Sequence, residues 1–292
     1  MIKKRGYLYA VLSAVIYGCM PLMAKNVYAD GVNPMTLVFL RNVLSLPILA
    51  VLAYRQYKTL AIPVKLVPTI GFMAAMGCCI TPILLFSSYQ FVESGTATVF
   101  HYIYPAIVVG AEMLFLKKEV HKNNIFCVLL CVVGIGLFYS PEQTPNLTGS
   151  VLALSSGLTF AIYVVMLAHF DSSRISGFLF SFYVAAFSSI VALLFCFAGG
   201  GLALPQTLAG WGLCLLFSLL VTTGAVVLFQ QSAFLIGSER TSILSTLEPI
   251  TSLVIGFFVF KEPMGIRVLI GAALVVTASL LIAVFDYQNA KT

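Results

Sequence analysis

The chain alternates between long apolar segments and short polar connections. Ten segments are largely apolar over about 20 residues, which is the length a helix needs to cross a bilayer core of roughly 30 Å. They are residues 7–25, 35–54, 67–88, 95–116, 123–140, 149–168, 177–198, 208–231, 241–260 and 266–285. Connections such as "KKEVHKNN" and "FKEPMGIR" hold turn-forming residues and most of the charge. The pattern predicts an all-α membrane protein with ten transmembrane helices.

Composition supports a lipid environment. Hydrophobic residues make up 60% of the chain and charged residues 9%, whereas soluble domains carry about 25% charged residues. So few charges cannot cover the surface of a water-soluble fold, so we expect a lipid bilayer around the helices. The N-terminal run "MIKKRGYLYAVLSAVIYGC" lacks a small-x-small cleavage site, so we interpret it as the first span and not as a signal peptide.

The basic residues predict the orientation. With the N-terminus inside, twelve Lys and Arg residues fall in inner segments, three fall in outer segments, and Arg41 lies inside a span. Basic residues accumulate on the cytoplasmic side of membrane proteins. We therefore expect a multi-pass protein of the cytoplasmic membrane with both termini in the cytoplasm. The net charge of +6 is scattered in ones to threes, which does not favour nucleic acid as a partner.

The two halves of the sequence repeat each other at an offset of 143 or 144 residues. The run "GYLYAVLSAVIYG" from residue 6 matches "GSVLALSSGLTFA" from residue 149, and "YPAIVVGAEMLFLKKE" from residue 104 matches "EPITSLVIGFFVFKE" from residue 248. We predict two five-helix units, residues 1–145 and 146–292. Because five is odd, the second unit enters the membrane inverted, as in many secondary transporters. Alternatively, the duplication only enlarges a stable bundle.

Polar residues inside the fourth and ninth spans fall on narrow helical faces, within about 60° at 100° per residue. On the fourth span these are Thr98, His101, Pro105 and Glu112. On the ninth they are Thr241, Ser245, Glu248 and Ser252. The alignment pairs His101 with Ser245 and Tyr104 with Glu248. Such stripes indicate two walls of a water-accessible cavity.

Glu248 is the strongest single candidate for the substrate site. A charged carboxylate facing lipid at a helix centre costs about 2.5–3.5 kcal/mol, so ionisable groups in spans usually face a cavity or the bundle interior. Glu248 and His101 line the cavity in this interpretation, or are satisfied packing residues in the alternative. Tyr102 is a cavity residue or an ordinary packing aromatic.

Further candidates come from other spans. Arg41 either snorkels outward or offers its charge to a substrate carboxylate or to Glu248. Tyr17 and Tyr163 suit an amphipathic organic solute, although core packing explains them as well. Of the adjacent Gln230 and Gln231, at most one faces the cavity.

Pro105 and Pro249 interrupt their helices, because proline lacks the backbone donor. They act as gating kinks or as plain features of the fold.

Other chemistry is not indicated by the sequence. The seven cysteines form no CxxC pair, so we predict no metal and no cofactor. A GxxxxGK[ST] loop is absent, so ATP is not the expected energy source. The three histidines fall on separate segments, which does not favour a catalytic cluster.

The chain resembles the EamA-type permeases of the drug/metabolite transporter superfamily over nearly its whole length. The resemblance rests on ten spans in two repeats, on Glu119 and Glu262 closing each copy, and on the "LEP" at residues 247–249. It implies export or exchange of small metabolites, with amino acids in several branches. It also implies that helices 1, 3, 4, 6, 8 and 9 surround a central cavity.

We therefore expect a secondary transporter of a small organic metabolite, most simply an amino acid or a related amphipathic compound. Proton coupling through Glu248, exchange against a counter-substrate and uniport stay open, as do monomer and homodimer. An exchanger of phosphorylated sugars or nucleotide sugars is the nearest alternative, although it would need several cations in the cavity. A membrane-embedded lipid enzyme and a non-transporting scaffold are alternatives of other classes.

Overall fold

The structure, a computed structural model, describes residues 2–92, 94–114, 122–137, 146–171, 175, 177–260 and 265–289. Within these ranges all regular secondary structure is helical, which confirms the all-α prediction. Glu119 and Glu262 lie outside the described residues, and so does the side chain of Glu112.

The first half of the chain is made of helices that often break within one membrane crossing. Its elements are α1 (Ile2–Gly18), α2 (Met20–Ala29), α3 (Pro34–Val43), α4 (Leu46–Tyr57), the short 3₁₀ helix η1 (Val64–Leu66), α5 (Val67–Met73), the π-helix η2 (Ala74–Ile80), α6 (Thr81–Ser88), α7 (Ser94–His101), α8 (Tyr104–Leu114) and α9 (Lys122–Gly136). Proline stands in the first turn of α2, α3 and α4, where its missing N–H costs no helical hydrogen bond.

The second half begins with two unbroken helices. Its elements are α10 (Leu147–His169), α11 (Gly177–Ala198), α12 (Leu208–Phe217), the π-helix η4 (Ser218–Val226), α13 (Val227–Ile236), α14 (Ser238–Leu244), α15 (Leu247–Phe260) and α16 (Ile266–Asn289). Side chains cap two of their N-termini, Asn146 at α10 and Thr207 at α12. Such caps satisfy the first N–H groups of a helix.

Six helices in the described part of the chain are long and apolar enough to cross a membrane. They are Lys3–Ala29, Pro34–Tyr57, Val64–Ser88, Leu147–His169, Gly177–Ala198 and Leu208–Ile236, each taken across its internal breaks. The other four predicted spans coincide with α7 and α8, α9, α14 and α15, and α16. The count of ten spans therefore stays a prediction.

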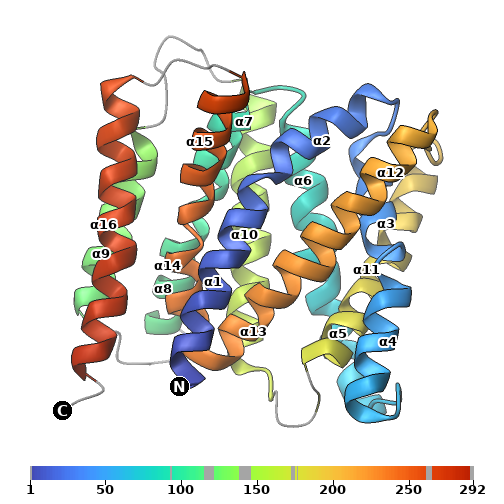
Figure 1. Ribbon diagram of the computed structural model, residues 1–292, viewed down its shortest axis with the longest axis horizontal. Helices are drawn as coiled ribbons and strands as arrows, with labels where there is room; N and C mark the ends of the chain where they lie inside the picture. The colour runs from blue at the N-terminus through green and yellow to red at the C-terminus, as the bar shows by residue number, and fades with distance from the viewer. Residues whose placement is uncertain are drawn as a thin grey trace.

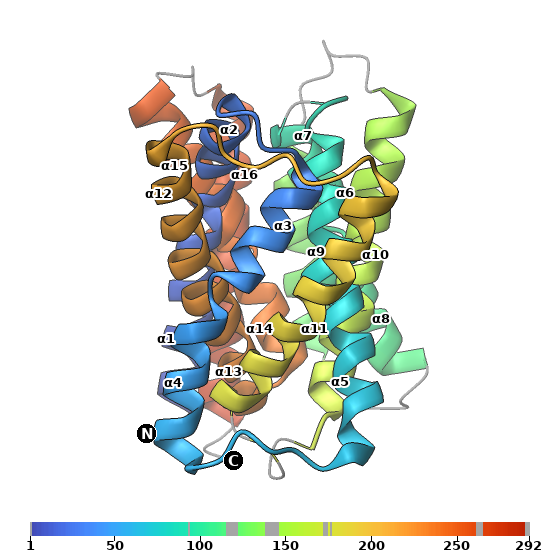
Figure 2. The ribbon, with the colours of Figure 1, turned by 90° about the vertical axis from the view of Figure 1, so that its right-hand side faces the viewer.

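The helices form an upright bundle in which the start of α1 and the end of α16 lie at the same end (Figures 1 and 2). Helix α10 begins at the opposite end, where Gly149 lies close to Phe91 and Val92 beyond the end of α6. Helices α1 and α10 therefore run in opposite directions. At one edge of Figure 1, α9 and α16 pack side by side. Gly134 permits this approach, because a Cβ there would lie 2.8 Å from the carbonyl oxygen of Gly271.

The largest buried cluster fills the centre of the bundle. It gathers side chains from α5, η2, α8, α10, α11 and α13, among them Tyr104, Tyr163 and Phe229. A second cluster lies around α2, α3, α6 and α12 and includes Phe86 and Phe217. Both clusters join elements from the two halves of the chain, so the halves share one core.

One acidic side chain ties the two halves together at the end of the bundle where α2 ends. The Asp30 carboxylate accepts hydrogen bonds from Thr207 Oγ1 at 2.8 Å and from the backbone N–H groups of Gln206 and Thr207 at 3.0 and 3.2 Å. The Thr207 hydroxyl, together with these two N–H groups, holds the pKa of Asp30 below its ordinary value of 3.8. Gly210 leaves room for this contact, because a Cβ there would displace the same carboxylate.

We expect Asp30→Asn to lower the Tm of the detergent-solubilised protein by several degrees at pH 7, because an amide has one acceptor oxygen where the carboxylate has two. A carboxyl group with a lowered pKa stabilises the fold above its ordinary value and loses that effect as pH falls through the lowered pKa. The Tm difference between wild type and variant should therefore narrow below pH 3.8. Gln206→Ala is the matched control, since its backbone donor is retained. A Tm difference that stays constant with pH would contradict this role of the carboxylate.

A shared central cavity and its relatives

A cavity with about 620 Å³ of empty space, including space open to solvent, lies between the two halves of the chain. Residues from α1, α2, α3, η2, α6, α7, α8, α10, η4, α13 and α15 line it, together with Ser245 between α14 and α15. They are Tyr17, Met20, Arg41, Gly77, Cys78, Thr81, Pro82, Leu85, His101, Tyr104, Phe160, Tyr163, Val226, Phe229, Ser245 and Glu248.

Two π-helices help to form the walls of this cavity. The segments η2 and η4 begin at Ala74 and Ser218, 144 residues apart, which is the offset of the sequence repeat. The π-helix is rare in proteins, and where it occurs it often lies at a functional site. Carbonyl groups of η2 receive donors from other helices: Ser188 Oγ reaches Ala74 O at 3.0 Å and Arg41 Nη2 reaches Cys78 O at 3.1 Å.

The fourth and ninth predicted spans each break in the middle. Helix α7 ends at His101 and α8 starts at Tyr104, while α14 ends at Leu244 and α15 starts at Leu247. Pro105 and Pro249 both lie in the first turn of the second helix, where proline fits without loss of a hydrogen bond. The structure thus has two complete breaks where the sequence predicts kinks.

Two tyrosine hydroxyls join these breaks. Tyr102 donates to the carbonyl of Ser245 at 3.0 Å, and Tyr104 donates to the carbonyl of Ser242 at 3.5 Å. The Tyr102 hydroxyl also lies next to the Glu248 carboxylate. The broken region of the first half therefore holds the broken region of the second half in place.

The cavity contains one basic and one acidic side chain that do not pair with each other. Arg41 is 3% exposed, and its Nε has no partner among the described residues. Glu248 is partly exposed, and no ion pair joins it to Arg41 in this part of the chain. Arg41 does not reach outward along lipid, because its guanidinium binds the carbonyl of Cys78 inside the bundle.

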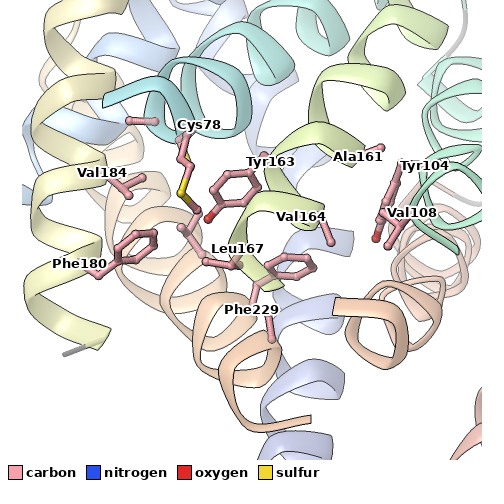
Figure 3. Close-up of a cluster of buried hydrophobic side chains, with 14 of the residues drawn as sticks. Cys78, Tyr104, Val108, Ala161, Tyr163, Val164, Leu167, Phe180, Val184 and Phe229 are labelled. Carbon is pink, nitrogen blue, oxygen red and sulfur yellow. The ribbon is translucent and has the colours of Figure 1, made fainter. Parts of the chain in front are cut away.

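Aromatic rings gather around Phe160 in one part of the cavity wall. Its ring centroid lies 4.8 Å from that of Tyr104, 5.4 Å from Phe229, 5.5 Å from His101 and 5.8 Å from Tyr163. Figure 3 shows Tyr104, Tyr163 and Phe229 approaching from three different helices. The wall offers ring faces and ring edges to an apolar ligand group or to a cation.

Tyr163 occupies the space left open by a glycine. A Cβ on Gly77 of η2 would overlap the tyrosine ring. The Gln230 amide donates to the Tyr163 hydroxyl at 2.8 Å, and Ser181 donates to the other end of that amide. Gln230 therefore positions the Tyr163 ring, although Gln230 itself does not line the cavity.

The structure brings together most of the predicted site residues. Six of them line the cavity, namely Glu248, His101, Arg41, Ser245, Tyr17 and Tyr163. Four others lie outside the lining residues. Thr98 is one turn before His101 on α7, the Thr241 hydroxyl bonds Ser232 at 2.9 Å, Gln230 lies behind Tyr163, and Tyr102 bonds Ser245.

Only part of the polar stripe on the ninth predicted span lines the cavity. Ser245 and Glu248 face the cavity, whereas Thr241 faces α13 and Ser252 donates to the carbonyl of Gly18 on α1 at 2.8 Å. The turn of 100° per residue applies only within an unbroken helix, so it does not hold from Ser245 to Ser252 across the interruption at residues 245–246. Thr241 precedes the interruption and lies outside the lining one turn before Ser245.

Several lining residues are absent from the predicted site, including Gly77, Cys78, Thr81, Phe160 and Phe229. Apolar aromatic residues carry no signal in a search for buried polar groups. The sequence repeat does give a signal for Phe160, because it lies 143 residues after Tyr17, and both rings line the cavity. Glycine at position 77 gives no sequence signal by itself.

The apolar helix bundle with a shared polar cavity defines a multi-pass membrane protein of the transporter type, and comparisons with known proteins support this class. The family described as "EamA-like transporter family" matches residues 4–140 and again residues 147–284. The chain belongs to this family, which confirms the resemblance seen in the sequence.

Individual relatives are distant but cover much of the chain. A protein of Archaeoglobus fulgidus named as an uncharacterized transporter is 25% identical over 281 residues, 93% of each chain. A protein of Escherichia coli named as a biotin transporter is 23% identical over 214 residues, 71% of each chain. A solved crystal structure superposes with a TM-score of 0.78 at 14% identity and covers 97% of this chain and 98% of its own. This last likeness shows the fold alone.

Gly77→Ala should destabilise the protein by about 1–3 kcal/mol, the usual cost of overpacking a core. The added methyl group overlaps the ring of Tyr163 and forces either the ring or η2 to move. The readout is the Tm in detergent. Gly71→Ala is the matched control on the same predicted span, since no atom lies within 4 Å of a Cβ there. Equal Tm values for the two variants would contradict the close packing of Tyr163 on η2.

Ser245→Cys should react with a water-soluble thiol reagent, because position 245 lines the cavity. The variant is best made together with Cys78→Ala, since Cys78 lines the same cavity. Ser232→Cys provides the control, because Ser232 is buried against Thr241 outside the cavity. Mass spectrometry of the labelled protein gives the modified fraction. If Ser245→Cys stays unmodified with and without ligands, the cavity is not open to water.

Proposed function

We propose that the protein is a secondary transporter that exports or exchanges an amino acid, or a related amphipathic compound, across the cytoplasmic membrane by alternating access. The observation that carries the proposal is the presence of Arg41 and Glu248, unpaired with each other, in one cavity. Charges inside a membrane protein are costly and usually mark a substrate or ion pathway. An amino acid supplies a carboxylate for the guanidinium and an ammonium group for the carboxylate.

The aromatic wall supports an amphipathic ligand. Phe160, Phe229 and Met20 offer apolar surface, and Tyr17 and Tyr163 add ring surface with a polar end. A bare ion would gain little from such a surface. A small organic molecule with an apolar body and charged groups would use both parts of the lining.

We further propose ten membrane spans arranged as two inverted five-helix copies, with both termini in the cytoplasm. The opposite directions of α1 and α10, the repeated position of η2 and η4, and the common end for the two chain ends support this arrangement. The excess of basic residues on one side supports its orientation. The active form is a monomer or a homodimer.

Phosphorylated sugars and nucleotide sugars fit the lining less well. Arg41 is the one Lys or Arg residue among the described residues that line the cavity, whereas phosphate recognition commonly uses several cations. Family membership favours transport over a membrane-embedded lipid enzyme.

Ligand binding by the purified protein tests the substrate class. A ligand that binds only the folded state raises the Tm, so a panel of amino acids, amines, sugar phosphates and nucleosides identifies the binder. Biotin joins the panel because a relative is named as a biotin transporter and because biotin has a carboxylate without an ammonium group. Transport of the binder into proteoliposomes preloaded with unlabelled ligand then measures exchange. Binding and transport of biotin or sugar phosphates, with none of amino acids, would refute the proposed substrate class.

Glu248→Gln should lower the flux of the identified amino acid in proteoliposomes at least tenfold, because the ammonium group loses its charged partner. If transport is coupled to protons through Glu248, the dependence of flux on a pH gradient should disappear as well. Glu239→Gln serves as the control, since Glu239 is an acidic residue of α14 outside the cavity lining. Unchanged flux in both conditions would remove Glu248 from the transport mechanism.

A further inference from the structure

His101 has a hydrogen-bond partner that fixes the position of its ring proton. Its Nδ1 lies 2.8 Å from Ser156 Oγ, and the same hydroxyl donates to the carbonyl of Ala153 at 2.6 Å. A serine hydroxyl has one proton, and a carbonyl oxygen can only accept. The bond between His101 and Ser156 must therefore be donated by Nδ1–H. In the neutral ring, Nε2 is then a hydrogen-bond acceptor.

The surroundings of His101 hold the ring at the edge of the cavity. His101 is the last residue of α7, is 7% exposed and lines the cavity. Gly157 on α10 allows the approach, because a Cβ there would lie 2.6 Å from the His101 carbonyl oxygen. The rings of Tyr102, Tyr104 and Phe160 lie 5.7, 5.4 and 5.5 Å from the imidazole. With Nδ1 engaged, Nε2 is the remaining polar atom of this lining ring.

We propose that His101 is a specificity-determining residue whose Nε2 accepts a hydrogen bond from an N–H group of the transported molecule, and that Ser156 is its positioning residue. This inference rests on the proposed function, because the ligand is the transported molecule itself. The cavity then holds a neutral acceptor on α7 and an anionic acceptor, Glu248, on α15.

The chemical class that fits these two acceptors is a primary ammonium group. Such a group has three N–H donors, whereas a fully methylated ammonium group has none. The aromatic wall attracts both kinds of cation through the ring faces, so it does not separate them. The two hydrogen-bond acceptors, His101 and Glu248, do separate them, and the protein should select primary amines over their trimethylated forms.

Binding of matched ligand pairs tests the selectivity. The probes are L-leucine, L-methionine and L-phenylalanine, each compared with its N,N,N-trimethyl derivative by calorimetry on the purified protein. Wild type should bind the primary amine at least tenfold more tightly than the methylated form. His101→Phe, which keeps a ring but has no acceptor, should reduce this ratio severalfold and leave the part that depends on Glu248, and His101→Gln should restore part of the loss.

The outcomes separate this inference from the proposed function. If a primary amine binds wild type but His101→Phe keeps the full selectivity ratio, the role of His101 is refuted and the amino acid assignment stands. If neither these three primary amines nor any amino acid of the Tm panel binds wild type, both the assignment and the role of His101 are refuted.

The ring proton itself can be observed by ¹⁵N NMR of protein labelled at its three histidines. The His101 signal is the one lost in His101→Phe. At neutral pH we expect Nδ1 protonated and Nε2 unprotonated, with a shift at Nε2 when the primary amine binds. Protonation at Nε2 in wild type would overturn the inference without any reference to transport.

Ser156→Ala tests the positioning role. Removal of the hydroxyl should convert the His101 signal to a mixture of tautomers and lower the selectivity ratio severalfold. Ser13→Ala is the matched control, because Ser13 is the equivalent residue of the first half and donates to the carbonyl of Ala225. It should leave both the tautomer and the ratio unchanged. A His101 signal that is unaltered in Ser156→Ala would show that Ser156 does not position the ring.

Discussion

Carbonyl groups freed from helical hydrogen bonding must find donors, because lipid provides none. The breaks and π-helices of this protein create such carbonyls in the middle of the bundle, and donors from distant parts of the chain satisfy them. The side chain of Ser188 donates to the carbonyl of Ala74, that of Arg41 to Cys78, and that of Tyr102 to Ser245. These bonds connect residues that are 37 to 143 positions apart. The shape of the cavity therefore depends on tertiary contacts. The buried polar residues stabilise the fold in addition to their proposed role in transport.

This dependence explains which parts of the fold could be predicted. Segment length and apolar composition are local properties, so all six long apolar helices coincide with predicted spans. Pro105 and Pro249 likewise marked the two interruptions, since proline removes a donor at a known position. The π-helices had no such signal. The run "AAMGCCI" of η2 has the composition of any apolar helix, and partners on α3 and α11 support its carbonyls.

The site was predictable to a similar extent and for the same reason. Glu248, His101 and Arg41 stand out because charge or polarity inside an apolar run requires an explanation, and all three line the cavity. The angles calculated for an ideal helix did not separate Ser245 from Thr241, because residues four apart in a helix share a face. Thr241 lies one turn earlier, outside the cavity lining, where its hydroxyl bonds Ser232. Phe160 could not be predicted as a site residue for a different reason. An aromatic residue in an apolar span belongs equally well to packing, and its central place among four rings exists only in three dimensions.

The two halves share a pattern but differ in detail, and this difference matters for a transporter. Helices α1 and α3 end at breaks within their spans, whereas their counterparts α10 and α11 are continuous. The carbonyls of η2 accept from Ser188 and Arg41, whereas in η4 the carbonyl of Ala225 accepts from Ser13 and the buried hydroxyls of Thr222 and Thr223 have no partner among the described residues. If the copies are inverted, as proposed, identical conformations would make both sides of the membrane equivalent. One-sided access to the cavity requires unequal halves, and exchange of their conformations would move that access to the other side. The different polar contacts of η2 and η4 are therefore the kind of asymmetry that alternating access needs, in segments that already line the cavity.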